Sequence, residues 1–187
     1  PEDWLILGCG SNELLNLAAI AYLTGKDNAV MANPSFIVYY SATRMVGAQA
    51  IQIPLTPDLR HDLTAMARAV NLDTKIVFIA NPNNPTGAIL AAEAADRIVR
   101  RASEVGAWLL ADEVYQGAER HAGPTPAFGR RGERVIVTNG LSKAYGLPGL
   151  RIGWCVAPAE QVGELWARKD YTTIGPSVIS DLLAARV

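Results

Sequence analysis

The sequence predicts an α/β domain in which helices flank a mainly parallel β-sheet. Short runs of apolar and β-branched residues alternate with longer segments of helical periodicity, which is typical of β-α-β units with right-handed crossovers. Two of these runs, Lys75–Ala80 and Trp108–Ala111, are apolar almost throughout, as expected for parallel strands that are covered on both faces. A chain of 187 residues that is 50% hydrophobic is long enough for one sizeable core, so we expect a single domain.

The elements follow one another along the chain with short polar connections. Strands are expected near residues 30, 50, 77, 109, 136 and 154, and Trp4–Leu7 could end either a strand or a helix. The polar segment Glu119–Arg134, which contains His121, is predicted to be an exposed loop, and His61 is expected at the surface without a functional role. The predicted helices are Leu14–Leu23, Pro34–Gly47, Leu63–Val70, Ala91–Val105, Ala159–Lys169 and a last one that starts at Ser177.

Composition argues against several classes of partner. The 17 basic and 18 acidic residues leave a formal charge of −1, so the chain has no electrostatic footprint for nucleic acid or an anionic membrane. The apolar runs are far shorter than the roughly 18 residues of a membrane span. Cys9 and Cys155 have no metal-ligand spacing and are too few for a disulfide framework, which is typical of a reducing compartment. We therefore expect a cytoplasmic protein with no metal site.

The turn Gly8–Glu13 (GCGSNE) directly precedes the first predicted helix. Ser11 or Asn12 could cap this helix, and its free backbone N–H groups would then point out of the turn toward a bound anion. A dinucleotide-binding fingerprint is the alternative, but it requires a third glycine where Glu13 stands, and no strand clearly precedes the turn. The turn is therefore predicted to bind a phosphate group.

The loop at 81–87, NPNNPTG, follows the apolar strand Lys75–Ala80. Its two prolines restrict the backbone and remove two N–H donors, so the loop is stiff and its asparagine amides must find partners outside it. A rigid structural turn would explain the same residues. Stiffness also suits a binding site.

Two acidic residues, Asp112 and Glu113, follow the next apolar strand. An apolar run that ends in Asp-Glu is also typical of the magnesium-binding strand of P-loop ATPases. The sequence contains no GxxxxGK[ST] motif, which argues against that class.

The segment Thr138–Trp154 (TNGLSKAYGLPGLRIGW) carries a lysine in a glycine-rich loop between two strands. The apolar run Val135–Val137 is predicted to form a buried strand, so Lys143 is expected at a strand end, where open α/β sheets bind their ligands. Partial burial beside a second cation, here Arg151, would lower the pKa of this amine and allow it to form an imine. The alternative is a solvated surface lysine.

Taken together, NPNNPTG at 81–87, ADEVY at 111–115 and SKAYGLPGLRIGW at 142–154 resemble the aspartate aminotransferase family of fold-type I pyridoxal-phosphate (PLP) enzymes. The histidinol-phosphate and aromatic aminotransferase branches are the most similar, and the resemblance covers essentially the whole chain. It implies a PLP cofactor and transfer of an amino group between an amino acid and a 2-oxo acid through a Schiff base on Lys143.

The resemblance also implies a set of residues that bind the cofactor phosphate. They are the turn residues Gly10, Ser11 and Asn12, the hydroxyl of Ser142 and the guanidinium of Arg151. Arginine favours phosphate because it can donate two parallel hydrogen bonds.

A second set of residues is implied around the cofactor ring. Phe36 would stack on the ring, and Asn84 and Tyr115 would donate hydrogen bonds to its phenolic oxygen. Asp112 would keep the pyridine nitrogen protonated, so that the ring accepts the electron pair released at the substrate α-carbon. An incoming amino acid would displace Lys143, whose free amine would then remove and return the proton. The implied catalytic residues are Lys143, Asp112 and Tyr115.

The chain departs from the family pattern in two respects. Gly140 stands where the family often has serine or threonine, which removes one phosphate hydrogen bond. Complete members are longer, with an N-terminal arm and a C-terminal small domain, so residues 1–187 are interpreted as a fragment, the large PLP-binding domain of a homodimer; a truncated protein that binds cofactor poorly is the alternative.

Other functions of the same fold remain open from the sequence. A β-lyase, decarboxylase or oxidase could use this core, and Lys169–Ile174 (KDYTTI) faintly resembles enzymes that act on arginine-like substrates. A PLP-binding sensor domain of a transcription regulator is the alternative outside enzymology.

Overall fold

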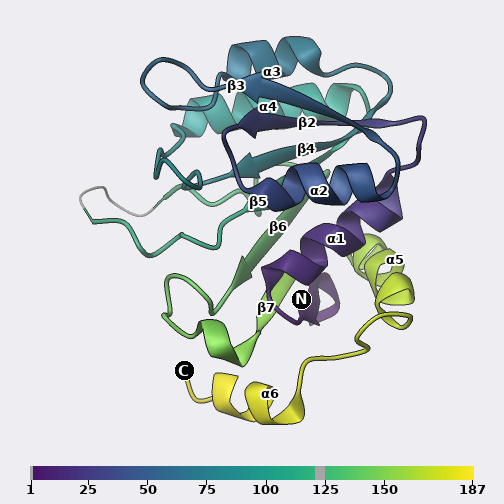
Figure 1. The fold of residues 1–187 in the computed structure, drawn as a ribbon, viewed down its shortest axis with the longest axis vertical. Helices are drawn as coiled ribbons and strands as arrows, with labels where there is room; N and C mark the ends of the chain where they lie inside the picture. The colour runs from purple at the N-terminus through teal and green to yellow at the C-terminus, as the bar shows by residue number, and fades with distance from the viewer. Residues whose placement is uncertain (1, 121–124) are drawn as a thin grey trace.

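The computed structural model describes residues 2–120 and 125–187, and within these ranges the strands form one seven-stranded sheet (Figure 1). Its strand order is β1-β7-β6-β5-β4-β2-β3. The strands are β1 (Leu5–Gly8), β2 (Asn28–Asn33), β3 (Gln49–Pro54), β4 (Thr74–Ala80), β5 (Trp108–Asp112), β6 (Val135–Gly140) and β7 (Gly153–Val156). The helices are α1 (Ser11–Tyr22), α2 (Ile37–Met45), α3 (Leu63–Ala69), α4 (Ala92–Glu104), α5 (Ala159–Lys169) and α6 (Val178–Ala184), with 3-10 turns η1 (Glu2–Trp4) and η2 (Pro148–Leu150).

The sheet is mainly parallel, as predicted. Strands β2 to β6 run in one direction, and β7 is antiparallel to both of its neighbours, β6 and β1. The loop between β6 and β7 contains only the short turn η2, and a connection without a crossover helix joins antiparallel neighbours. The β6–β7 loop, which carries Lys143, therefore folds back at the end of the sheet where the parallel strands finish.

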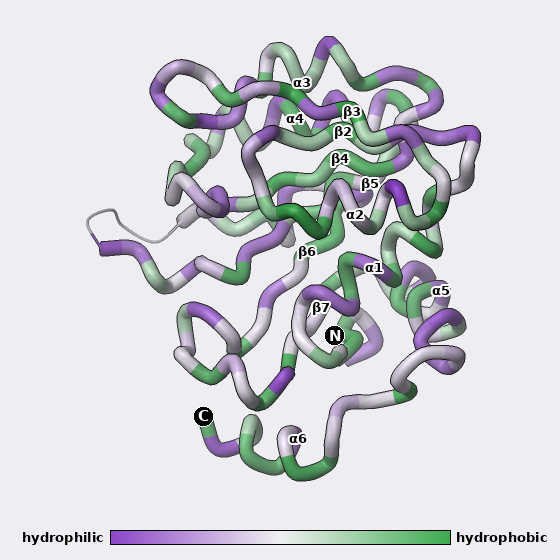
Figure 2. The backbone as a smooth tube through the Cα atoms, viewed as in Figure 1, coloured by the Kyte–Doolittle hydropathy of each residue, from purple (hydrophilic) through white to green (hydrophobic). Residues whose placement is uncertain are grey.

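Two hydrophobic clusters cover opposite faces of the sheet. Along β4, Ile76 and Phe78 face the cluster formed with α1, α2 and α5, whereas Val77 and Ile79 face the one formed with α3 and α4. This alternation follows from the two-residue period of a strand. Figure 2 shows hydrophobic residues along β4 at the centre of the fold and also along α6, which lies away from both clusters.

The predicted elements are present with shifted ends. The apolar segment Trp4–Leu7 contributes to a strand, β1, so a strand does precede the turn at Gly8–Glu13. Helix α2 begins at Ile37 rather than at Pro34, because Phe36 has the extended conformation of a residue that precedes a helix. The last predicted helix, expected from Ser177 onward, is the short helix α6.

The prediction of surface exposure is wrong for His61 and, within the predicted loop, for Phe128. His61 is buried, and one of its ring nitrogens, Nε2, lies 2.9 Å from the carbonyl oxygen of Ala80 at the end of β4. Burial also lowers the pKa of this imidazole. Within Glu119–Arg134, Phe128 is fully buried in the cluster beside α4, and its backbone N–H donates to Glu113. His121 lies outside the described residues.

Candidate active site

A cavity of about 210 Å³ lies at the ends of β4, β5 and β6. Parallel strands present their C-terminal ends at one edge of a sheet, so loops that are distant in sequence meet there. Nine of the ten residues singled out from the sequence as cofactor-binding line this cavity, and Gly10 adjoins it next to Ser11. The lining residues are Ser11, Asn12, Phe36, Tyr39, Ala80, Pro82, Asn84, Asp112, Val114, Tyr115, Ser142, Lys143, Pro148 and Arg151.

The turn before α1 forms one end of the cavity. Gly10 occupies the position before the helix, with φ 83°, and no side chain caps it, so the prediction that Ser11 or Asn12 caps the helix is wrong. The N–H groups of the first helical turn have no partner within the helix. The Glu13 N–H donates to the Gly10 carbonyl at 3.3 Å, so those of Ser11 and Asn12 are available to an anion at this end of the cavity.

Arg151 joins the β6–β7 loop to this turn. Its guanidinium donates from Nη1 to the Ser142 hydroxyl at 3.2 Å and to the Pro148 carbonyl at 2.9 Å, and from Nη2 to the Cys9 carbonyl at 3.3 Å. A Cβ atom at Gly10 would lie only 2.3 Å from Nη2. The missing side chain at Gly10 is therefore what admits the guanidinium.

These groups suit a phosphate. Helix N-terminal amides, the Ser142 hydroxyl and the Arg151 guanidinium are all donors, and together they match the three acceptor oxygens of a phosphate ester. Strand β7 packs directly against the turn, because a Cβ atom at Gly153 would lie 2.3 Å from the Ser11 backbone nitrogen. The residues present therefore fit the phosphate of the expected cofactor: they supply the hydrogen-bond donors, and the packing of β7 against the turn holds these donors in place.

Asp112 ends β5 and forms the buried end of the cavity. Its carboxylate is 3% exposed, and burial raises its pKa to about 6. The Tyr39 hydroxyl donates to Oδ2 at 2.9 Å, and the Val114 backbone N–H donates to Oδ1 at 3.3 Å. A buried carboxylate of this kind is suited to pair with a cationic nitrogen, because the charged form gains most from such a partner.

Tyr39 is a site residue that the sequence analysis did not single out. It is fully buried, its ring stacks on Phe78 with centroids 4.9 Å apart, and Phe36 packs edge-on against it at 5.8 Å. Burial and the adjacent Asp112 raise its pKa well above the ordinary value, so the hydroxyl stays protonated and remains a donor. The signal in the sequence is its position three residues after Phe36, the residue that directly precedes α2.

Lys143 lies at the mouth of the cavity. Its side chain is exposed rather than partly buried as predicted, and its Nζ lies 5.6 Å from the centroid of the Tyr115 ring. Such a distance allows a cation–π contact. The amine is thus accessible, and an aromatic ring limits where it can lie.

The NPNNPTG loop is held on several sides. The Asn81 backbone N–H donates to the Asp112 carbonyl at 3.0 Å, and its side-chain oxygen accepts from the Leu90 N–H at 2.9 Å. The Asn83 side chain bonds to Ser35 but also to Thr86, so the prediction that the asparagines find partners only outside the loop is wrong for this residue. These contacts fix the loop that carries Asn84 into the cavity.

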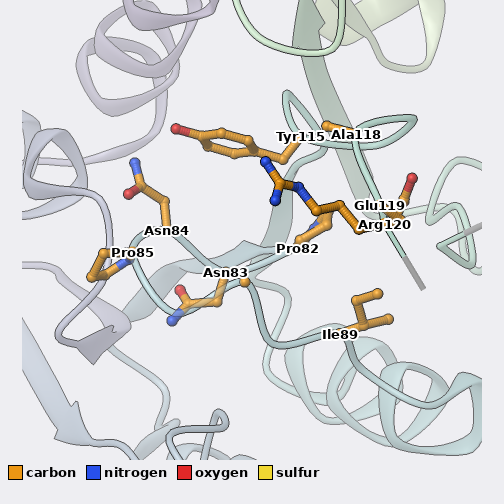
Figure 3. A pocket seen from close by; sticks show the side chains of 10 residues that line it. Pro82, Asn83, Asn84, Pro85, Ile89, Tyr115, Ala118, Glu119 and Arg120 are labelled. Carbon is orange, nitrogen blue, oxygen red and sulfur yellow. The ribbon is translucent and has the colours of Figure 1, made fainter. Parts of the chain in front are cut away.

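A second, larger cavity of about 450 Å³ adjoins the first. The two share Pro82, Asn84 and Tyr115. Figure 3 shows Asn84 on one side of its opening and Tyr115 and Arg120 on the other. Among the described residues that line it, none is a buried titratable group of the kind that Asp112 provides, so we place the chemistry in the smaller cavity.

Comparison with known proteins gives consistent results. The family model for aminotransferase class I and II matches residues 1–187. A histidinol-phosphate aminotransferase of Cupriavidus pinatubonensis is 44% identical over 162 residues, which are 86% of this chain and 43% of that protein. One from Symbiobacterium thermophilum is 31% identical over 99% of this chain and 51% of that protein. The chain thus spans about half the length of these relatives, or less.

Solved structures share the fold over nearly the whole chain. An aspartate aminotransferase mutant of Thermus thermophilus superposes with a TM-score of 0.91 at 26% identity and covers 96% of this chain and 50% of that one. A PLP-dependent aminotransferase from Streptococcus suis gives 0.90 at 30% identity, with 97% and 49% covered.

Proposed function

Because the chain belongs to the aminotransferase class I and II family, we propose that it forms the large cofactor-binding domain of a PLP-dependent aminotransferase. The reaction is transfer of an amino group between an amino acid and a 2-oxo acid. One observation carries the proposal: an amine, a buried carboxylate and a phosphate-type donor set line a single cavity, although they come from loops far apart in the sequence.

The phosphate of the cofactor is assigned to the α1 end of the cavity. Ser11 and Asn12 offer backbone N–H groups there, whereas the Gly10 N–H already donates to the Gly8 carbonyl at 2.8 Å, so Gly10 contributes the space beside them. Ser142 and Arg151 add side-chain donors. Their redundancy compensates for Gly140, which offers no hydroxyl.

The ring is assigned to the space between Phe36 and the strand ends. Asp112 holds the proton on the pyridine nitrogen, with Tyr39 keeping the carboxylate in place, and Asn84 and Tyr115 donate to the phenolic oxygen. Bound PLP supplies an electron sink for the pair released at the substrate α-carbon.

Lys143 is assigned two roles. Its Nζ is the amine that carries the cofactor covalently, and once free it moves the proton of the substrate α-carbon. Its exposed position gives it access to both groups, and the Tyr115 ring restricts its orientation.

The relatives' names make histidinol phosphate the first amino donor to test, with a 2-oxo acid as acceptor. The proposal includes a homodimer in the cytoplasm. It includes no nucleic-acid or membrane partner, because the formal charge of −1 gives no basic footprint for either. Within the described residues, no helix has the length and apolar character needed to cross a bilayer.

The test combines labelling and absorbance. Borohydride reduction of the PLP-loaded protein, followed by digestion, should leave a pyridoxyl label on Lys143, and the label should be absent from Lys143→Ala but present in the control Lys26→Ala. Addition of an amino donor should convert the cofactor to its pyridoxamine form. A label on another residue contradicts the assignment, and a spectrum that an amino donor never changes favours a sensor over an aminotransferase.

A further inference from the structure

A buried ion pair lies directly behind the phosphate-binding turn. Lys169, the last residue of α5, is fully buried, and its ammonium lies 3.1 and 3.0 Å from the two carboxylate oxygens of Glu13 in the first turn of α1. Thr173 completes the cluster with a hydroxyl that bonds to both Lys169 and Glu13. None of these three residues lines the cavity.

The Glu13 carboxylate folds back over the turn that precedes its own helix. Its Oε2 accepts the Cys9 backbone N–H at 2.6 Å. A Cβ atom at Gly8 would lie 3.0 Å from the same oxygen and 2.9 Å from Leu14 Cγ, so the glycine leaves room for this conformation. The Cys9 carbonyl, on the other side of the residue, accepts from Arg151.

Both backbone polar groups of Cys9 are therefore held by charged side chains. Gly10 follows Cys9 directly and α1 begins one residue later. The orientation of the backbone at Cys9 therefore determines where the first N–H groups of α1 point. It also determines where the Arg151 guanidinium finds its carbonyl acceptor.

Burial of the Glu13 and Lys169 charges costs electrostatic free energy. A buried charge is unfavourable unless it is paired and hydrogen-bonded, and an apolar pair of the same shape is often at least as stable. A carboxylate behind a phosphate site would also repel the phosphate. Lys169 cancels that charge, and although burial alone would raise the pKa of Glu13, hydrogen bonds from Thr173, Cys9 and Lys169 hold it below the ordinary value.

We propose that Glu13 and Lys169 are positioning residues for the cofactor phosphate. They hold the backbone at Cys9 in the orientation in which the turn Gly10–Asn12 and Arg151 face the phosphate. This inference rests on the proposed function. The pair acts through the turn and touches neither the cofactor nor the substrate.

The experiment compares the affinities for PLP and for pyridoxal, which lacks the phosphate. The variants are Glu13→Gln, Lys169→Met and the double variant, measured by fluorescence titration of the cofactor-free chain. Each single variant should lower the preference for PLP over pyridoxal about tenfold, as expected for the loss of one charge-assisted hydrogen bond. The double variant should regain part of the preference, because it leaves neither an unpaired carboxylate nor an unpaired ammonium behind the turn.

A matched control removes another ion pair, whose residues do not line the cavity. Asp96→Asn breaks the contact between Asp96 and Arg131 and should leave the preference for PLP unchanged. If Lys169→Met does not fold, as judged by circular dichroism, Glu13→Gln decides the question alone.

Three outcomes would overturn the inference. Single variants that keep the preference within twofold would leave the pair a purely structural contact. A Glu13→Gln variant that prefers PLP more strongly would mean that Glu13 only repels the phosphate. A wild-type chain that binds neither compound would instead refute the proposed function, and this inference with it.

Discussion

The two ends of the cavity are built in opposite ways. At the α1 end, the donors are partly solvent-exposed and several: helix N–H groups, the Ser142 hydroxyl and Arg151. At the β5 end, a single buried carboxylate, Asp112, is held by one tyrosine and one backbone N–H. At the exposed end, the loss of one donor is partly compensated by the other donors and by water. At the buried end, the loss of a single partner leaves a polar group unsatisfied, and this costs more free energy because water cannot replace the partner.

The largest effect should follow from Asp112→Asn at the buried end. The amide cannot hold a proton on the pyridine nitrogen, so we expect kcat to fall by about 100-fold or more, the scale seen when a preorganised electrostatic group is removed. Rapid-mixing absorbance of the half-reaction with an amino donor measures it. An exposed control, Asp73→Asn, should retain the wild-type rate; an Asp112→Asn rate within fivefold of wild type would contradict the assignment.

The buried carboxylates should also make stability depend on pH. Burial raises the pKa of Asp112 to about 6 and that of Glu113 to about 7, above the values of an unfolded chain. The native state therefore binds more protons than the unfolded state between about pH 4 and 7, so this contribution to stability is present below pH 4 and is lost as the pH rises through the native pKa values. For Asp112 the loss is roughly 3 kcal/mol.

Urea unfolding of the cofactor-free chain at pH 5 and pH 7 measures this dependence. Asp112→Asn should flatten the change, because the amide does not titrate. An unchanged pH dependence in this variant would mean that other groups cause it.

At the exposed end, Arg151→Gln should weaken PLP binding by about tenfold, which corresponds to the lost charge-assisted hydrogen bonds to phosphate. Pyridoxal affinity should stay unchanged, since pyridoxal has no phosphate. Fluorescence titration with both compounds gives the comparison, and equal losses for the two would place Arg151 outside the phosphate site.

The smallest effect should come from Tyr39→Phe, which removes one neutral donor and costs about 1 kcal/mol. Because the Tyr39 hydroxyl stabilises the charged carboxylate, its loss should raise the pKa of Asp112 and shift the acid limb of the rate profile to higher pH. A pH profile of the half-reaction rate tests this, with the exposed neighbour Tyr40→Phe as control. A pH profile identical to that of the wild type would mean that Tyr39 does not influence the Asp112 carboxylate during the reaction.

Local patterns in the sequence were informative wherever one segment carries its own signal. The apolar runs predicted β4 and β5, and Asn84, Asp112 and Lys143 were each expected after a predicted strand; in the structure all three line one cavity. Hydrophobic periodicity and strand direction suffice for this, because parallel strands bring their ends together without further information.

These local patterns do not predict contacts between residues that are far apart in the sequence. Polar composition predicted an exposed loop around Phe128, yet this ring fills the space beside α4. A lone histidine between predicted elements suggested a surface position, yet the end of β4 supplies the carbonyl that His61 contacts. In both cases burial depends on which distant element packs nearby, and the local residue types do not encode it.

The sequence by itself determined the order of strands and helices and the residues offered at each strand end, since both follow from local backbone preferences and from the alternation of apolar residues. Only the tertiary structure decided that Tyr39 donates to Asp112, 73 residues away, and that Lys169 pairs with Glu13 across 156 residues. Such pairs form because packing excludes water and leaves each polar group with few available partners, and that constraint exists only in the folded chain.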